Sequence, residues 1–342
     1  MLNANEHKKF TACGDAEAEM LLGKVVSEIA EAFSGTSLCV VLGGSYGRGD
    51  GGVRSDRENG ILYNDLDFFV FSRKKSDGGE KLLKEIAGKY EKELKIDVDF
   101  SRIMSVEEIK RNGSRLMMQE LKRGYHLVYG EDLLAEYLVS LPAEELPFSE
   151  ACRLLLNRGM GLMLAGEKIS NNQDDPDFIL RNIYKAVLGA GDATLIIRNM
   201  YRWKITERLE VIERSDMPQE WKVLYREAVE FKCSPVRQVS RDISEFWNSA
   251  RNFFRDTIRQ AAGGGADLYE GFFKCCRQNG ELSLKNYIKY CIKSHTLPLA
   301  AWKYHTMPAV ALLAADIYTA LSEMPEKVDN TMKLYRHWLI FN

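Results

Sequence analysis

The spacing of apolar residues changes once along this 342-residue chain, and the change restricts the folds open to it. As far as about residue 145, stretches with helical spacing alternate with short runs of β-branched and aromatic residues that have the character of strands. Beyond about residue 150, every strongly patterned stretch has the spacing of a helix. The turn residues divide in the same way, because 16 of the 26 glycines but none of the eight prolines precede Pro142. We therefore predict an α+β chain, with a small mixed β-sheet domain over residues 1–145 and an all-α helical bundle domain over residues 146–342.

In the first part, the patterns follow the order helix, strand, loop, strand, helix, strand. The stretch DLDFFVFS (65–72) is almost wholly apolar after its two aspartates, which is typical of a strand covered on both faces. The polar stretch DGGVRSDRENGILYN (50–64) predicts a long exposed loop. Two helices are predicted at residues 16–33 and 78–94, and two further strands at residues 37–44 and 95–101. In the second part, helices are predicted at residues 150–169, 176–203, 220–232, 241–262, 282–294 and 308–322, with an interruption at the glycines 263–265.

Composition excludes several classes of protein. With 45% apolar and 28% charged residues, the chain has the composition of an ordinary globular protein. A net charge of −2 provides no overall attraction to nucleic acid or to an anionic membrane, so neither is expected as a partner. The N-terminal residues lack the apolar core of a secretory signal, and the longest apolar stretch, from Met307, contains Asp316 and predicts a buried helix. Because the seven cysteines have no Cys-x-x-Cys spacing and the five histidines no i, i+4 spacing, we expect a reduced, cytoplasmic protein without a transition metal.

The stretch VVLGGSYGRGDGG (40–52) places six glycines within ten positions, directly after a predicted strand. Glycine lets main-chain N–H groups approach a ligand closely, and a glycine-rich turn between a strand and a helix is a common way to bind a phosphate. Such a turn is also a common loop. By itself, the stretch leaves both interpretations open.

Two pairs of aspartates lie at the predicted strands. Asp65 and Asp67 are two residues apart at the mouth of one strand, so both carboxylates are on the same face, roughly 7 Å apart. Asp97 and Asp99 repeat this spacing on the next strand. If the two strands are neighbours, three or four carboxylates converge, and such a concentration of negative charge is unfavourable without a cation. Magnesium, which prefers oxygen ligands, is the expected cation, although either pair alone could be the polar face of a half-exposed strand.

Taken in order, the turn and the acidic strands resemble the nucleotidyltransferase superfamily of DNA polymerase beta. The family pattern is a Gly-Gly/Ser turn, an Asp-x-Asp in an apolar strand and a third acidic residue in a later strand. It is matched here by GGSYGRGD (43–50), NDLDFFVF (64–71) and IDVDF (96–100). The turn is also similar to the Gly-Tyr-Gly-Arg-Gly turn of the uridylyltransferases that modify signalling proteins. The resemblance covers roughly residues 37–110, about a fifth of the chain.

The chain departs from the compact members of this family in two respects. The gap between Ser45 and Asp65 is longer than theirs, and Asn64 stands where they frequently have Ser. The third acidic position is also ambiguous, since either Asp97 or Asp99 could occupy it. The start of a further helix soon after Asp99 favours that residue.

The resemblance implies transfer of a nucleoside monophosphate from a nucleoside triphosphate, with ATP as the expected nucleotide and pyrophosphate as the leaving group. The acceptor would be a hydroxyl group of a small molecule or of a protein. Asp65, Asp67 and Asp99 would hold two magnesium ions, which can neutralise charge on both the entering and the leaving oxygen. The third aspartate, Asp99 or Asp97, would also take the proton of the acceptor hydroxyl.

The same resemblance assigns the triphosphate to the glycine-rich turn. Gly43 and Gly44 would offer main-chain N–H groups to the β- and γ-phosphates, and Ser45 would offer its hydroxyl. Arg48 would either add positive charge near the leaving pyrophosphate or lie solvated in the loop.

In the helical part, Arg181, Lys185 and Asp192 follow one another at spacings of four and seven residues, which places them on one face of a helix. This face is either a solvated stripe with one ion pair or part of the active site, with Arg181 and Lys185 near the triphosphate and Asp192 near the acceptor. Nucleotidyltransferases of the kanamycin type likewise join the catalytic domain to a helical bundle, a likeness of layout only.

Two other functions stay open at this point. One is a catalytically silent nucleotide-binding module, regulatory or antitoxin-like, which the intact Asp65, Asp67 and Ser45 disfavour. The other is an RNA-terminal nucleotidyltransferase. The lack of net positive charge disfavours that function, although the arginine-rich span from Arg198 to Arg259 keeps it open.

Overall fold

The structure is a computed structural model, which describes residues 9–54, 60–74, 79–236, 240–295, 302–324 and 329–341. The chain divides into two compact units. The first unit comprises Met1–Leu141 and Glu230–Val236, and the second comprises Pro142–Val229 and Arg237–Asn342. The described residues are rich in helix and contain a small mixed sheet, as expected of an α+β chain.

The sheet of the first unit consists, in the described residues, of β1 (Leu38–Leu42), β2 (Leu66–Ser72), β3 (Val98–Phe100), β4 (Met104–Ser105) and β5 (His126–Tyr129). The strand order is β3-β2-β1-β5, and β4 pairs with the end of β2. Strand β2 is antiparallel to β1 and parallel to β3 and β4, while β1 is antiparallel to β5. The predicted mixed sheet is therefore confirmed, with β4 and β5 as strands that the sequence pattern did not indicate.

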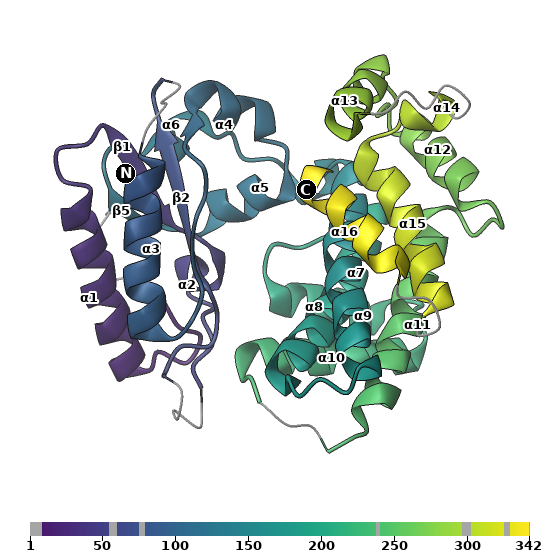
Figure 1. Cartoon of the computed structure of the whole chain (residues 1–342), viewed down its shortest axis with the longest axis horizontal. Helices are drawn as coiled ribbons and strands as arrows, with labels where there is room; N and C mark the ends of the chain where they lie inside the picture. The colour runs from purple at the N-terminus through teal and green to yellow at the C-terminus, as the bar shows by residue number, and fades with distance from the viewer. Residues whose placement is uncertain are drawn as a thin grey trace. The chain divides into compact units, whose positions relative to one another are not determined.

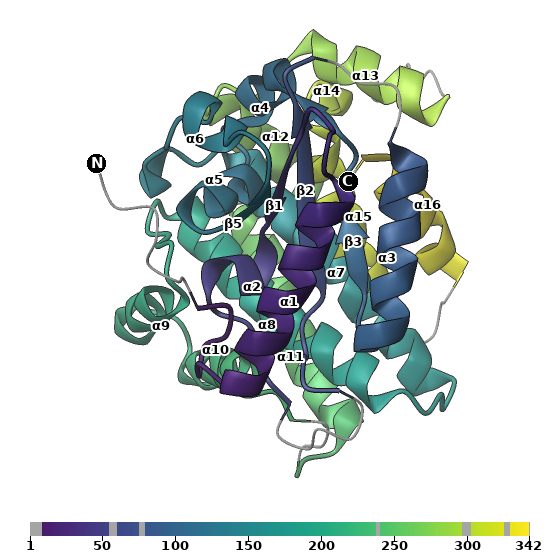
Figure 2. The same cartoon turned by 90° about the vertical axis from the view of Figure 1, so that its left-hand side faces the viewer.

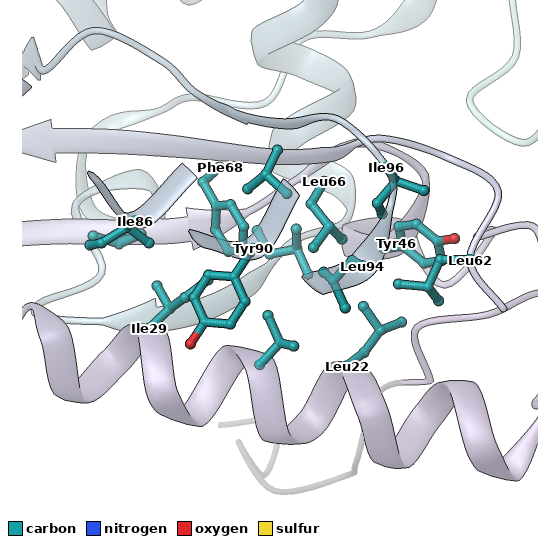
Figure 3. Packing of buried hydrophobic residues seen from close by; sticks show 14 of the residues in the cluster. Leu22, Ile29, Tyr46, Leu62, Leu66, Phe68, Ile86, Tyr90, Leu94 and Ile96 are labelled. Atoms are coloured by element: carbon teal, nitrogen blue, oxygen red, sulfur yellow. The ribbon is translucent and has the colours of Figure 1, made fainter. Parts of the chain in front are cut away.

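Helices cover both faces of this sheet. On one face, α1 (Ala16–Ala32) and α3 (Glu80–Leu94) lie side by side, as Figures 1 and 2 show, and their apolar side chains pack against the strands (Figure 3). On the other face, α4 (Val106–Asn112), α5 (Leu116–Arg123) and α6 (Leu133–Tyr137) form a second apolar cluster with β1 and β2. The sheet is thus a middle layer between two helical layers.

Strand β2 supplies side chains to both clusters, because successive residues of a strand point to opposite faces. Leu66, Phe68 and Val70 are buried with α1 and α3, whereas Phe71 is buried with α4, α5 and α6. Phe68 also stacks on Phe100 of β3, with 4.8 Å between the ring centroids. The prediction that this strand is covered on both faces is confirmed.

Capping residues fix where two of these helices begin. Asp15 accepts a hydrogen bond from the backbone N–H of Ala18 and caps α1. Ser105 and Glu108 form a reciprocal capping box at the start of α4, in which each side chain accepts from the other residue's backbone N–H. These contacts satisfy N–H groups that have no partner inside the helix.

The prediction of a long exposed loop over residues 50–64 is wrong for the part of it that the structure describes. Leu62 is buried in the cluster of α1 and α3, and Tyr63 is buried edge-on against Phe231, from the segment Glu230–Val236 of the same unit. The polar residues of the stretch concealed these two apolar ones, and Phe231 is too distant in the sequence for a local pattern to indicate it. Residues 55–59 of this stretch lie outside the described residues.

The second unit is helical throughout its regular elements in the described residues. Helices α7 (Phe148–Ser170) and α8 (Pro176–Ile197) pack together, and α11 (Ile243–Ala261) packs against both. Each of the six predicted helical stretches overlaps a helix, and the glycines 263–265 follow α11 as expected. The other elements are η1 (Ala143–Glu145), α9 (Ile205–Arg214), α10 (Gln219–Cys233), α12 (Leu268–Gln278), α13 (Leu284–Ser294), α14 (Trp302–His305), α15 (Ala309–Glu323) and α16 (Asp329–Phe341). The end of α10, from Glu230, belongs to the first unit.

Glycines and aromatic residues fill the interior of this unit together. A Cβ on Gly166 of α7 would collide with the ring of Trp247. Phe253, Phe254 and Phe272 are fully buried, which fits core residues rather than surfaces for stacked bases. Over the residues that the structure describes, no helix combines the length and the hydrophobicity that a membrane span needs.

Candidate functional site

The parallel pairing of β2 with β3 sets the positions of the predicted acidic residues. In the register of the two strands, Leu66 lies opposite Val98, and Asp67 lies opposite Asp99. Leu66 and Val98 are buried against α1 and α3. Asp67 and Asp99, as the next residues of each strand, therefore point to the other face, as does Asp65. Aspartates from two separate segments are thus neighbours at the start of both strands.

The pKa of Asp99 reflects its partial burial and other acidic groups nearby. The pKa of Asp99 is raised above its usual value, first because its carboxylate loses part of its hydration. Negative charge on Asp65, Asp97 and Glu91 raises it further. A bound cation would relieve this repulsion.

The glycine-rich stretch lies against one of these aspartates, Asp67. Gly43 donates its backbone N–H to the carbonyl oxygen of Asp67, with an N–O distance of 2.8 Å. Gly44 has a φ of 61°, in the left-handed region, and a Cβ at this position would collide with the Asp67 carboxylate. The short helix α2 (Gly44–Arg48) starts here, and Ser45 is partly exposed in its first turn. The structure therefore brings the glycine–serine turn and Asp67 into contact.

Tyr46, which our sequence analysis did not single out, joins α2 to the residues that precede Asp65. Its fully buried hydroxyl donates to the carbonyl oxygen of Gly52 (2.9 Å). The same hydroxyl accepts from the backbone N–H groups of Tyr63 (3.0 Å) and Asn64 (3.3 Å). The Asn64 Oδ1 atom in turn accepts from the Gly52 N–H at 2.7 Å. We call these four residues the Tyr46 clasp; a large aromatic residue among six glycines was the signal that could have indicated it.

Arg48 lies at the end of α2, with two acidic side chains near its guanidinium. Its Nε atom is 3.7 Å from Asp50 Oδ2, and its Nη1 atom is 3.8 Å from Glu120 Oε2. Neither the solvated-loop interpretation nor the pyrophosphate interpretation foresaw these two ion pairs. A role for Arg48 near pyrophosphate stays a prediction.

The three residues predicted to share a helical face lie on α8 of the second unit. Arg181, Lys185 and Asp192 are each partly exposed. Asp192 accepts a hydrogen bond from the Tyr225 hydroxyl at 2.7 Å, and its Oδ1 atom lies 3.0 Å from Nε of the buried Arg208. Asp192 therefore takes part in an internal ion pair. The parts predicted for Arg181 and Lys185 in nucleotide binding stay predictions.

The chemistry of the acidic residues suits magnesium. Within the described part of the chain, no three or more His, Cys, Asp or Glu side chains are gathered closely enough to hold a metal ion as they stand. Magnesium, however, commonly takes only one or two carboxylates and completes its shell with water and substrate phosphates. Asp67 and Asp99, opposite each other on adjacent strands, offer such a pair. The two-ion site stays a prediction.

No protein-family model matches the chain. No curated protein matches it either.

Proposed function

We propose that this chain is a magnesium-dependent nucleotidyltransferase, which transfers a nucleoside monophosphate from a nucleoside triphosphate to a hydroxyl group and releases pyrophosphate. One observation carries the proposal. Asp67 lies opposite Asp99 across two parallel strands, and its carboxylate packs against the backbone of Gly44, next to Ser45. Acidic groups and a glycine–serine turn in contact are what this reaction requires, because the triphosphate and its metal must meet.

The residues of the first unit would have the following roles. Asp65, Asp67 and Asp99 would hold magnesium, which when bound supplies positive charge to the phosphate oxygens. The Gly44 main chain and the Ser45 hydroxyl would orient the triphosphate. Asp99 would also take the proton of the acceptor hydroxyl, a role that the family resemblance implies.

The remaining parts of the proposal rest on helical spacing, on the family resemblance and on a likeness of layout to kanamycin-type nucleotidyltransferases. Arg181 and Lys185 would bind the triphosphate, and the helical region that follows the sheet would contribute to binding the acceptor. We propose ATP as the nucleotide and a small molecule or a protein as the acceptor.

Release of pyrophosphate tests the proposal directly. The purified protein is incubated with each nucleoside triphosphate and Mg²⁺, with and without a pool of small molecules and proteins, and pyrophosphate is measured with labelled product. We expect release that requires Mg²⁺ and falls by at least about 100-fold in Asp67→Asn. The matched control is Asp174→Asn, an exposed aspartate of the second unit, which should keep full activity.

Other outcomes separate the competing functions. Nucleotide binding without pyrophosphate release from any acceptor pool would favour a silent regulatory module. Extension of an RNA oligonucleotide in preference to the small-molecule pool would favour an RNA-terminal enzyme. Failure to bind any nucleoside triphosphate in the presence of Mg²⁺ would reject all three functions.

A further inference from the structure

Helix α13, labelled in Figure 1, carries a row of exposed aliphatic residues next to a row of lysines along its sequence. Leu284, Ile288 and Ile292 are 62%, 50% and 68% exposed, although large aliphatic residues are normally buried. Each of them is followed directly by an exposed lysine, and α13 contains no acidic residue. The lysines are Lys285, Lys289 and Lys293.

The opposite side of α13 holds the helix in a defined orientation. The Tyr290 ring lies edge-on to His305, with 4.4 Å between centroids, and stacks on Phe341 at 5.2 Å. The Asn286 side chain donates to the backbone carbonyl oxygens of Glu281 (3.0 Å) and Thr306 (2.8 Å). The aliphatic row is therefore exposed because the helix is anchored by its other side.

The two rows have the form of a helix-packing surface. Residues four apart on a helix make a ridge, and the space between two such ridges receives a ridge from another helix. The aliphatic ridge and the lysine ridge of α13 border an open groove of about 350 Å³. The groove is lined by Lys285, Ile288, Lys289, Ile292 and Lys293.

We propose that this face of α13 is a docking site for an amphipathic helix of a partner protein, one that carries aliphatic residues flanked by Asp or Glu. The partner's aliphatic ridge would fill the groove, and its carboxylates would lie beside Lys285 and Lys289. Charge decides between the possible occupants. A second copy of α13 would bring lysines against lysines, whereas an acidic helix is complementary. An anionic membrane would also attract the lysines and take up the aliphatic row, but only a helix would also pack a ridge into the groove between the two rows.

A binding experiment with a designed peptide tests the proposal. The probe is a labelled synthetic peptide of about 15 residues with Leu along one helical face and Glu on both flanks. This length is enough for the peptide to form a helix once docked. One comparison peptide carries Lys in place of Glu, and another has the acidic composition in scrambled order. We expect the acidic helix to bind saturably, and the comparison peptides to bind at least about tenfold more weakly.

Variants on the protein locate the binding. Ile288→Ser with Ile292→Ser should weaken the acidic helix at least about tenfold, as should Lys285→Glu with Lys289→Glu. Lys293 is left unchanged because it donates to the carbonyl oxygen of Ile340 and supports the fold. Met20→Ser is the matched control, since Met20 is 73% exposed on α1, and it should have no effect.

Three results would overturn the proposal. The first is no saturable binding of the acidic helix, and the second is equal binding of the acidic, basic and scrambled peptides. The third is binding to vesicles of phosphatidylcholine with phosphatidylserine, but not of phosphatidylcholine alone, that depends on Ile288 and Ile292 while the acidic helix does not bind. That third result would assign the face to a membrane.

Discussion

Gly44 and Asp67 are packed so closely that a single added methyl group on Gly44 would collide with the Asp67 carboxylate. Gly44 also has a φ of 61°, which costs a residue with a Cβ roughly 1–2 kcal/mol. The contact couples the backbone of the glycine-rich turn to the acidic strand. Any change at Gly44 should therefore alter both stability and the position of Asp67.

We predict that Gly44→Ala destabilises the protein by about 1–3 kcal/mol and lowers pyrophosphate release at least about tenfold. Urea unfolding measures the first effect, and the nucleotide assay the second. Gly88→Ala is the matched control, because Gly88 lies inside α3 with open space around it and should gain up to about 1 kcal/mol of stability. Equal unfolding free energies for Gly44→Ala and the unchanged protein would contradict the contact.

The Tyr46 clasp should be a large local source of stability. Tyr46→Phe removes one hydroxyl, but it leaves the N–H groups of Tyr63 and Asn64 and the Gly52 carbonyl without that partner. We expect a loss of about 2–4 kcal/mol, because buried polar groups left unpaired cost more than the average hydrogen bond. In the control Tyr129→Phe, the hydroxyl is partly exposed and its hydrogen bonds are 3.1 and 3.4 Å long, so the loss should stay below about 1 kcal/mol.

Some helices and strands of the first unit could be predicted from the sequence, and others could not. Strand β2 could be located because it is an almost continuous apolar run, and helix α1 because its apolar residues recur with a helical period. Strands β4 and β5 have two and four residues, which is too short for a period to appear. The pairing of β2 with β3 could only be assumed, since register depends on contacts between segments about thirty residues apart.

In the candidate site, too, the residues could be predicted from the sequence but their contacts could not. Aspartates at positions 65, 67, 97 and 99 are visible in the sequence, but the register that places Asp67 opposite Asp99 is not. The Tyr46 clasp depends on hydrogen bonds across 17 and 18 residues, and no local propensity indicates such a contact. The ion pair of Asp192 with Arg208 joins α8 to α9. Helical periodicity within α8 placed Asp192 on one face of that helix, but it could not indicate a partner on another helix.

The register also predicts which aspartate is the third acidic residue. Asp99 lies opposite Asp67, whereas Asp97 comes before β3 and contacts β2 through its backbone carbonyl, which accepts from Leu66. We expect Asp99→Asn to lower pyrophosphate release at least about 100-fold and Asp97→Asn less than about tenfold. Both variants should bind Mg²⁺ more weakly, Asp99→Asn the more so, which a Mg²⁺ titration of activity measures. The reverse order of the two variants would assign the role to Asp97.

The capping box of α4 predicts a pH dependence of stability. Hydrogen bonds from Arg102 and from the Ser105 backbone lower the pKa of Glu108 to about 2. A carboxylate with a lowered pKa stabilises the folded state fully above its unfolded-state pKa of about 4.5, and this contribution is lost as the pH falls toward 2. Glu108→Gln should therefore cost about 1 kcal/mol at pH 7 and almost nothing near pH 2, with solvent screening limiting the cost.

Urea unfolding of both proteins at several pH values between 2 and 7 measures this difference. Glu85→Gln is the control, because Glu85 is exposed and its Oε1 atom lies 3.8 Å from Lys81 Nζ, so its ion pair is weak. A cost of Glu108→Gln that stays constant across this pH range would show that the charge of Glu108 contributes nothing to the capping box.

In the second unit, substitution of Asp192 can distinguish a structural role, as counter-ion of Arg208, from a role in binding the acceptor. Its carboxylate lies beside the buried guanidinium of Arg208, whose Nη1 atom also donates to the Tyr201 hydroxyl at 2.8 Å. Removal of the negative charge leaves a buried cation without its counter-ion, so Asp192→Asn should cost about 3 kcal/mol in the free energy of unfolding. Asp174→Asn, at an exposed position, should cost nothing measurable. If Asp192→Asn instead left stability unchanged and lowered only the transfer to the acceptor, Asp192 would act on the acceptor and not on Arg208.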